Sequence, residues 1–201
     1  MATITLRNGL ILQYLGSGHV MQIHEKEAIG QEERAGAEIN RIVSKDGVVI
    51  RQFRNHDAEV LFADGVRAQF SKKRMEWTLT NNLGKRRRFR NGIYSDMEEV
   101  PTAVETDQET GAKMMIREDG VLSVTYADGS VYCHHQDGTK IHTTADHSEI
   151  RIEKKNYASH TIKIGKAAQQ TDHQSEMHRN AFQRALDDTV LETYLPDGSM
   201  T

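Results

Sequence analysis

A turn dipeptide that recurs every nine residues is the feature that most constrains the fold of this chain. Asp119-Gly120, Asp128-Gly129 and Asp137-Gly138 lie nine residues apart, and the segments between them have the composition of strands. Asp tolerates positive φ and Gly adopts it without steric cost, so Asp-Gly between hydrophobic segments predicts a two-residue hairpin loop. The interval therefore predicts strands of about seven residues joined by tight turns, which form an antiparallel meander.

The same interval recurs over most of the chain, and self-similarity at a fixed period indicates a repeat architecture. We therefore predict a mainly β fold: an extended antiparallel meander of short strands with Asp-Gly and Asn-Gly hairpins, plus one C-terminal helix. The predicted turn-forming residues are Asn8, Gly9, Asp46, Gly47, Asp64, Gly65, Asn91, Gly92, Asp119, Gly120, Asp128, Gly129, Asp137, Gly138, Asp197 and Gly198.

The strand pattern is interrupted in three places. Residues 25–40 contain almost no large apolar side chain, 96–112 are acidic and contain Pro101, and apolar residues from about 175 to 188 recur at helical intervals. We predict N-terminal strands over 1–24, a charged linker or weak helix over 25–40, a first meander over 41–95, an acidic loop over 96–112, a second meander over 113–165, a helix over 166–188, and a terminal strand and turn over 189–201.

Two-residue loops also determine which residues face each other. A loop at Asn55-His56 places Phe53 opposite Ala58 and Arg51 opposite Val60, and the next loop places Leu61 opposite Ala68 on the other face. Apolar residues then change sides from one hairpin to the next. Cross-strand pairs contribute only ~0.2–1 kcal/mol each. We therefore expect such a sheet to be marginal alone, and to be covered on both faces by other chains or other sheets.

Composition and charge exclude several classes. The net charge of -3 argues for neither a nucleic-acid partner nor a membrane surface. Cys133 is the single cysteine, so no internal disulfide forms and a reducing compartment is expected. A run of ~18 apolar residues, which a spanning helix requires, is missing from the sequence. These features predict a cytoplasmic protein without a membrane segment.

The strongest charge cluster is the basic run Lys85–Arg90. If this run pairs with the strand before it across the turn 81–84, Arg88 lies opposite Trp77 at cation–π distance. Three interpretations stay open: a solvated strand face, a site for an acidic protein partner, and a nucleic-acid or import-factor site. The candidate partner-binding residues are Trp77, Lys85, Arg86, Arg87, Arg88 and Arg90.

Catalytic and metal-binding patterns receive little support. The predicted register makes Cys133 and His142 cross-strand neighbours with His135 on the same face, but structural zinc sites usually need four ligands. A Cys–His nucleophile needs an orienting third group and a pocket, which an open meander does not provide. Nucleotide-binding and hydrolase motifs are also missing. We predict that the chain is not an enzyme and that it has no catalytic, cofactor-binding or metal-binding residues.

The strings "WTLTNNLGKRRRFRNG", "EDGVLSVTYADGSVYCHHQDGTKI" and "ETYLPDGSMT", with "NGLILQYLGSG", "KDGVVIRQF" and "ADGVRAQF", resemble the repetitive β-region of the sperm-associated antigen seventeen family. That family comprises scaffold components of a projection on one central-pair microtubule of motile cilia. Similar "DGT" meanders occur in the glycine-rich C-terminal box of centriolar T-complex-ten-like proteins, an extended single-layer sheet that binds a partner peptide.

The resemblance implies a structural protein of an axonemal central-apparatus complex, located in the cytoplasm, the cytoskeleton and the cilium axoneme. Its implied partners are other axonemal proteins, including microtubule-associated ones, in a hetero-complex formed through sheet edges and faces, with neither membrane nor nucleic acid. The alternative from the residues themselves is a nucleic-acid or import-factor binding module that uses the basic strand Lys85–Arg90.

Overall fold

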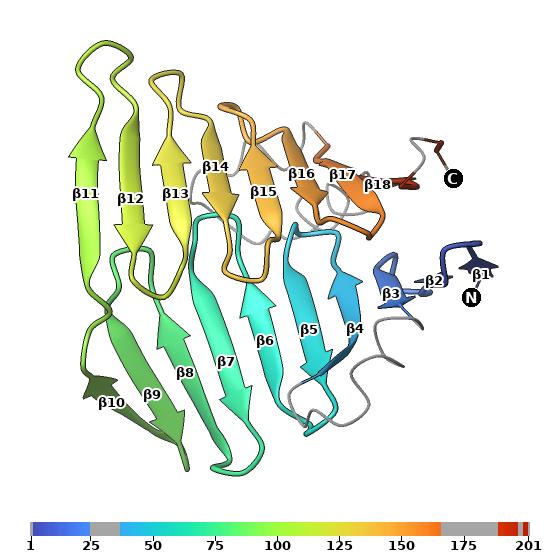
Figure 1. Cartoon of the computed structure of the whole chain (residues 1–201), viewed down its shortest axis with the longest axis horizontal. Helices are drawn as coiled ribbons and strands as arrows, with labels where there is room; N and C mark the ends of the chain where they lie inside the picture. Colours follow the sequence, from blue (N-terminus) through green and yellow to red (C-terminus); the bar gives the residue numbers. More distant parts are fainter. Residues whose placement is uncertain (1, 25–36, 166–188, 197–198, 201) are drawn as a thin grey trace, which may run out of the picture.

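The computed structural model describes residues 2–24, 37–165, 189–196 and 199–200. They form two antiparallel sheets in which every strand pairs with its neighbours in sequence, so the predicted meander is confirmed (Figure 1). Sheet A contains β1 (Ala2–Thr5), β2 (Leu10–Tyr14), β3 (Val20–His24), β4 (Glu38–Val43), β5 (Val49–Phe53), β6 (Ala58–Leu61), β7 (Arg67–Ser71), β8 (Glu76–Thr80), β9 (Arg86–Arg90) and β10 (Ile93–Met97). Sheet B contains β11 (Thr102–Thr106), β12 (Lys113–Arg117), β13 (Leu122–Thr125), β14 (Val131–His134), β15 (Lys140–Thr143), β16 (Glu149–Glu153), β17 (Ser159–Lys163) and β18 (Val190–Tyr194).

Several predicted boundaries differ from the structure. The expected acidic loop over 96–112 is wrong in part, because β10 extends to Met97 and β11 occupies Thr102–Thr106. Backbone hydrogen bonding to β12 holds β11 in the sheet, and this bonding does not require apolar side chains. The connection between the sheets is 98–101. β4 begins at Glu38, inside the predicted linker.

Some predictions concern residues outside the described ranges. They are the remainder of the linker, over 25–36, the helix over 166–188, and the last turn at Asp197-Gly198. Within the described residues, no helix is long and apolar enough to cross a membrane.

The two sheets overlap only along one end of each. In Figure 1 the lower ends of the sheet B strands lie against the upper ends of the sheet A strands, and the remainder of each sheet extends away from the other. We call the region of contact the overlap zone. The inner face of each sheet is the face that contacts the other sheet there, and the opposite face is the outer face.

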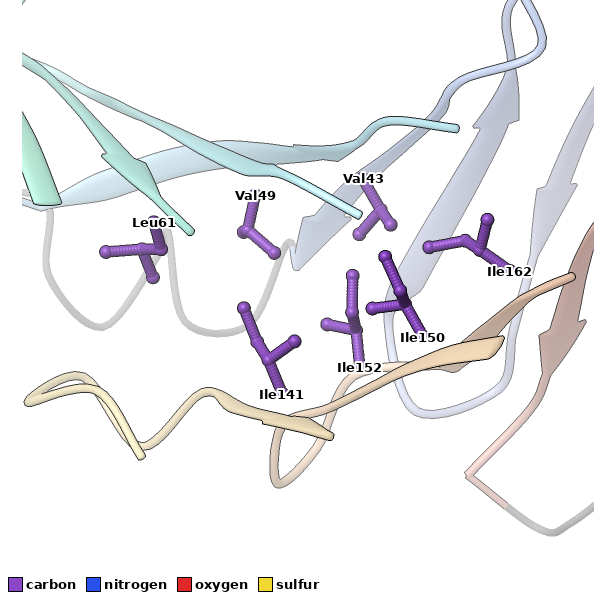
Figure 2. Packing of buried hydrophobic residues seen from close by; sticks show 7 residues of the cluster. All are labelled: Val43, Val49, Leu61, Ile141, Ile150, Ile152 and Ile162. Carbon is purple, nitrogen blue, oxygen red and sulfur yellow. The ribbon is translucent and has the colours of Figure 1, made fainter. Parts of the chain in front are cut away.

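Aliphatic side chains from both inner faces form the main core in the overlap zone. Figure 2 shows side chains of sheet A pointing toward those of sheet B. Each fully buried aliphatic side chain contributes roughly 1.5–3 kcal/mol, so this cluster is the principal attraction between the sheets. Its buried members are Val43, Val49, Leu61, Ile141, Ile150, Ile152 and Ile162.

A second hydrophobic cluster lies toward the chain termini. Leu10, Leu12 and Val20 of sheet A pack there with Tyr157 and Ala158, which belong to the turn between β16 and β17. The inner faces therefore cover each other in the overlap zone. Cover by other chains or other sheets was expected on both faces. The second sheet provides it for the inner faces in the overlap zone, and the expectation remains a prediction for the outer faces and for the parts of the inner faces beyond this zone.

The hairpin loops differ in type from the prediction. At Asp46-Gly47 the N–H of Ser44 donates to the carbonyl of Val48 at 2.9 Å, so this closing pair encloses three residues. Only Gly47 has positive φ, at +76°, whereas a two-residue type I′ loop needs positive φ at both central residues. That condition is met at Asn91-Gly92, with φ of +51° and +79°, and there the flanking residues pair directly.

The third loop residue shifts the register by one position, so each side chain of the partner strand lies on the face opposite to the predicted one. Gln52, and not Phe53, lies opposite Ala58, while Arg51 lies opposite Glu59 and not Val60. The loop after β6 has the same consequence, since Leu61 lies opposite Arg67 and not Ala68. The predicted change of sides between hairpins is therefore wrong: each face carries continuous rows of side chains across several strands.

Candidate protein-binding surfaces

An aromatic row crosses the outer face of sheet A. Phe70 of β7 pairs with Trp77 of β8, which pairs with Phe89 of β9, which in turn pairs with Tyr94 of β10. Ring centroids lie 5.2 Å apart for Phe70 and Trp77 and 4.7 Å apart for Phe89 and Tyr94. Trp77 is 37% exposed and Tyr94 63%. These four side chains, which we call the aromatic row, are held side by side on regular strands, with Trp77 and Tyr94 exposed and Phe70 and Phe89 half-buried.

An aliphatic row runs beside the aromatic row on the same face. It follows the register from Ile42 through Ile50, Val60 and Ala68 to Leu79, which is 42% exposed. None of these side chains belongs to either hydrophobic cluster of the described residues. The outer face of sheet A therefore carries two adjacent apolar rows that belong to neither described core, and large exposed apolar patches are a common feature of interaction sites.

The six predicted partner-binding residues are divided between the two faces. Arg86, Arg88 and Arg90 lie on the inner face, because Arg88 pairs with Thr78. Trp77 and Arg87 lie on the outer face, and Lys85 is in the turn before β9. The predicted contact of Arg88 with Trp77 is wrong, since Trp77 lies opposite Phe89. The prediction assumed symmetric pairing about the turn 81–84, and the observed register differs from that pairing by one position.

Arg87 is engaged within the outer face. Its Nε lies 3.2 Å from Oδ1 of Asp96, and its guanidinium lies 5.6 Å from the ring centroid of Tyr94. The cation–π contact near the basic run thus involves Arg87 and Tyr94. Both charged partners are exposed, so the ion pair contributes little to stability.

The register separates the candidate ligands Cys133 and His142 by face. Cys133 lies opposite Ile141, and His142 lies opposite Tyr132 on the other face. Sγ of Cys133 is 3.5 Å from Nε2 of His135, which also hydrogen bonds the carbonyl of Phe62 at 2.9 Å. Burial raises the pKa of the Cys133 thiol to about 12. No group of three metal-ligating side chains occurs among the residues that the structure describes.

An ionic network borders the core of the overlap zone, and sequence analysis missed it. Arg41 is buried, with Nε 2.7 Å from Oε1 of Glu38 and Nη2 2.9 Å from Oδ2 of Asp137 in sheet B. Arg51 binds both Glu38 and Glu59. Burial alone would raise the pKa of the Asp137 carboxyl, but Arg51 and Arg41 hold that pKa well below its ordinary value. The network connects the two sheets through charged groups that each have an oppositely charged partner within the network.

Two further polar contacts join the sheets on either side of this network. Arg117 of sheet B donates to the carbonyls of Gly65 and Asn81, both at 2.7 Å. Gln22 of sheet A donates to Nε2 of His160 at 2.8 Å, and Thr193 lies 3.2 Å from Nδ1 of the same ring. Burial, with a smaller contribution from Arg41, lowers the pKa of His160 to about 4. The sequence signal for these contacts is a charged or polar residue two positions from an apolar one on the same strand face.

The predicted turn-forming residues at 8–9, 46–47, 64–65, 91–92, 119–120, 128–129 and 137–138 all lie in turns between strands.

Both sheets end in strands that pair on one side only, namely β1 and β10 in sheet A and β11 in sheet B. Such edge strands present unpaired backbone donors and acceptors. The described residues therefore define a class: an open, two-sheet antiparallel meander with free faces and free edges.

Comparisons with known proteins give matches among solved structures alone. No family model and no curated protein matches this chain. One match is the G-box domain of the microcephaly protein CPAP, whose structural analysis suggests a role in centriole elongation. It has 14% identity and a TM-score of 0.35, and the match covers 81% of this chain and 92% of that domain.

The TCP10 domain of Danio rerio CPAP in complex with a peptide of Danio rerio STIL also matches, with 12% identity, a TM-score of 0.35, and coverage of 100% and 96%. The TCP10c domain of Drosophila melanogaster Sas-4 matches with 14% identity, a TM-score of 0.27, and coverage of 77% and 98%. These are centriolar domains of the second type that the sequence resembles. The sperm-associated antigen seventeen family has no support in these comparisons. At such low identities and TM-scores, the matches establish neither a family nor a function for this chain.

Proposed function

We propose that this chain is a non-enzymatic structural protein that binds other proteins through the outer face of sheet A and through its sheet edges. The observation that carries the proposal is the aromatic row, which is exposed on one face of an ordered sheet. Trp and Tyr held on rigid strands bury a large area at little cost in side-chain entropy and dominate many protein interfaces. The aliphatic row beside it extends the apolar area that a partner would cover.

The free edges supply a second means of attachment. The edge strand β10 carries Tyr94 at its outer face, so a partner strand added to β10 would continue the aromatic row onto its own side chains. Main-chain hydrogen bonds would then provide affinity, and the side chains on alternate positions would provide specificity.

The finer form of the proposal is a scaffold role in a hetero-complex of the motile-cilium axoneme, at the central apparatus, among axonemal and microtubule-associated proteins of the cytoskeleton. The nine-residue rhythm of turns and its resemblance to the ciliary scaffold family support this form. Protein binding through the sheet surfaces does not depend on the axonemal location.

Proximity labelling in multiciliated cells tests both forms. The chain is fused to a labelling enzyme, and the wild type is compared with a variant carrying Trp77→Ser and Tyr94→Ser. The matched control carries Tyr126→Ser, in the loop between β13 and β14, and Val190→Ser, in β18, which remove side chains of similar exposure, 43% and 53%. We expect axonemal proteins to be labelled by the wild type and the control and to be lost with the aromatic-row variant.

The two forms fail in different ways. Labelling of a reproducible partner set that is lost with the aromatic-row variant, but at a site other than the axoneme, would contradict only the axonemal form. A partner set that is unchanged in the aromatic-row variant would refute the outer face as the binding surface.

A further inference from the structure

The inner face of sheet A carries, on β9, three arginines whose arrangement the proposed function does not use. Arg86, Arg88 and Arg90 occupy alternate positions of β9, so all three project from this face. Arg86 continues the cross-strand row of Leu61, Arg67 and Thr80 at the end of β9 nearer sheet B, and Arg88 and Arg90 follow in the part of β9 that extends away from sheet B (Figure 1). Arg88 and Arg90 are exposed and Arg86 is half-buried. Alternate residues of a strand are about 6.8 Å apart, so the three guanidinium groups form an evenly spaced cationic line.

Carboxylates pair with the other arginines around this face. Those arginines are Arg41, Arg51, Arg67, Arg74 and Arg117, and their partners come from Glu38, Glu59, Glu76, Asp119 and Asp137. Among the residues that the structure describes, none of the three β9 arginines forms an ion pair. Arg88 instead donates from Nε to the hydroxyl of Ser95 at 3.2 Å, which leaves its charge unneutralised. The cationic line of β9 is therefore the exception to a consistent pairing pattern.

A groove adjoins the cationic line. It has a volume of ≈440 Å³ and runs across β5 to β9, with Arg86 in its wall and Gln69, Thr78 and the carboxylates of Glu59 and Glu76 among its lining residues. The lining thus offers carboxylates, an amide and a hydroxyl as well as guanidinium groups. A ligand that fits it must accept hydrogen bonds from arginine and also donate hydrogen bonds of its own.

We propose that this surface binds an extended acidic peptide segment of a protein partner. Side chains on one face of an extended peptide have the same spacing as alternate residues of β9, and guanidinium groups bind carboxylates with paired, charge-assisted hydrogen bonds. The backbone N–H groups of a peptide can donate to Glu59 and Glu76. The sugar-phosphate backbone of DNA has no hydrogen-bond donor to offer these carboxylates, and so the lining favours the peptide.

This inference goes beyond the proposed function, because it concerns the opposite face of sheet A and a partner of different chemistry. The two are separable by experiment. The variant with Trp77→Ser and Tyr94→Ser should keep its affinity for the acidic peptide, since both of these residues lie on the outer face.

Fluorescence anisotropy with the full chain tests the proposal. The probe is a labelled Glu-Thr repeat peptide of about twelve residues, which spans about 40 Å when extended. A Gln-Thr repeat of equal length and a labelled oligothymidylate serve as the other probes. We expect the Glu-Thr peptide to bind, more weakly as salt is added, and the Gln-Thr peptide not to bind.

A matched pair of variants locates the site. Replacing Arg86, Arg88 and Arg90 with glutamine should weaken binding of the Glu-Thr peptide about tenfold or more. Arg87→Gln, on the same strand but the opposite face, should leave binding within about twofold of the wild type. Arg88→Gln alone, which loses only the hydrogen bond to Ser95, gives a second test if the triple variant does not fold, and should weaken binding at least about threefold.

Absence of Glu-Thr peptide binding by the wild type would overturn the proposal. An equal loss in Arg87→Gln and in the inner-face variants would also overturn it, because the effect would then reflect net charge. Tighter binding of oligothymidylate, lost in the inner-face variants, would assign the surface to nucleic acid instead.

Discussion

Replacing Gly47 with alanine probes the contact between the two sheets at one point of the overlap zone. A Cβ at this position would lie 2.6 Å from Cδ1 and 3.0 Å from Cγ2 of Ile150 in sheet B. Positive φ costs an alanine about 1–2 kcal/mol, and forcing a methyl group into a packed core typically costs about 1–3 kcal/mol more. We therefore expect Gly47→Ala to lower the free energy of unfolding by about 2–5 kcal/mol.

Gly138→Ala is the matched control. Gly138 has φ of +86° and closes the same type of three-residue loop, but nothing lies within 4 Å of its Cβ position. It should lose only the backbone contribution of about 1–2 kcal/mol. Urea unfolding followed by circular dichroism gives both values. Equal losses in the two variants would refute the packing of Ile150 against the turn between β4 and β5.

Three further predictions concern the core, a buried histidine and the single thiol. Ile152→Ala should lower the free energy of unfolding by about 2–5 kcal/mol, whereas Ile93→Ala, at a position that is 69% exposed, should change it by less than about 0.5 kcal/mol; similar effects in thermal unfolding would contradict the assigned core. The pKa of His160 is about 4 in the native protein because burial disfavours the charged ring, and it is about 6.5 in an unfolded chain. Between these two pKa values the unfolded chain therefore binds a proton that the native state does not. As pH decreases from about 6.5 to about 4, this group should lower the free energy of unfolding by about 3 kcal/mol. His160→Gln should reduce that slope in urea titrations, and an unchanged slope would show that His160 is not buried in neutral form. Cys133 is fully buried with a pKa raised to about 12, so a thiol reagent at neutral pH should label it only in urea; rapid labelling of the native protein would contradict its position in the inner face of sheet B.

The strands could be predicted from the sequence because each hairpin turn depends on the residues within it. Asp-Gly pairs mark hairpins whatever the surrounding structure, and they predicted the meander correctly. Predicting the loop length required the φ of the residue before each glycine. Asp46 keeps negative φ, whereas Asn91 adopts +51°, and this difference of one residue determines which side chains share a face.

The acidic stretch after β10 shows a second limit of local patterns. Thr102–Thr106 has little apolar character, and its charge and the nearby Pro101 predict a loop. The strand forms because β12 offers it a backbone edge to pair with. Such an edge is a tertiary feature that no single segment encodes.

Sequence analysis identified several residues of the candidate surfaces but did not predict how they are arranged on the two faces. The sequence singled out Trp77 and the basic run Lys85–Arg90, but the incorrect register placed Arg88 beside Trp77. The correct register places Phe89 beside Trp77 and separates aromatic from basic residues by face. The contact between sheets was not predictable from strand patterns, since it joins residues that are about a hundred positions apart, such as Arg41 and Asp137.

The limited overlap of the sheets follows from the order of residues along β4, β5 and β6. Each strand carries on its inner face an apolar residue at the end that meets sheet B and a charged residue two positions away, as in Val43 and Arg41, or Leu61 and Glu59. Hydrophobic attraction is non-directional and by itself would favour a larger overlap. A buried charge, in contrast, needs a specific partner, and Arg41 finds one in Asp137, at the turn where β14 leads into β15. The charged row therefore limits how far the sheets overlap, and the remainder of each face of sheet A lies outside the contact with sheet B.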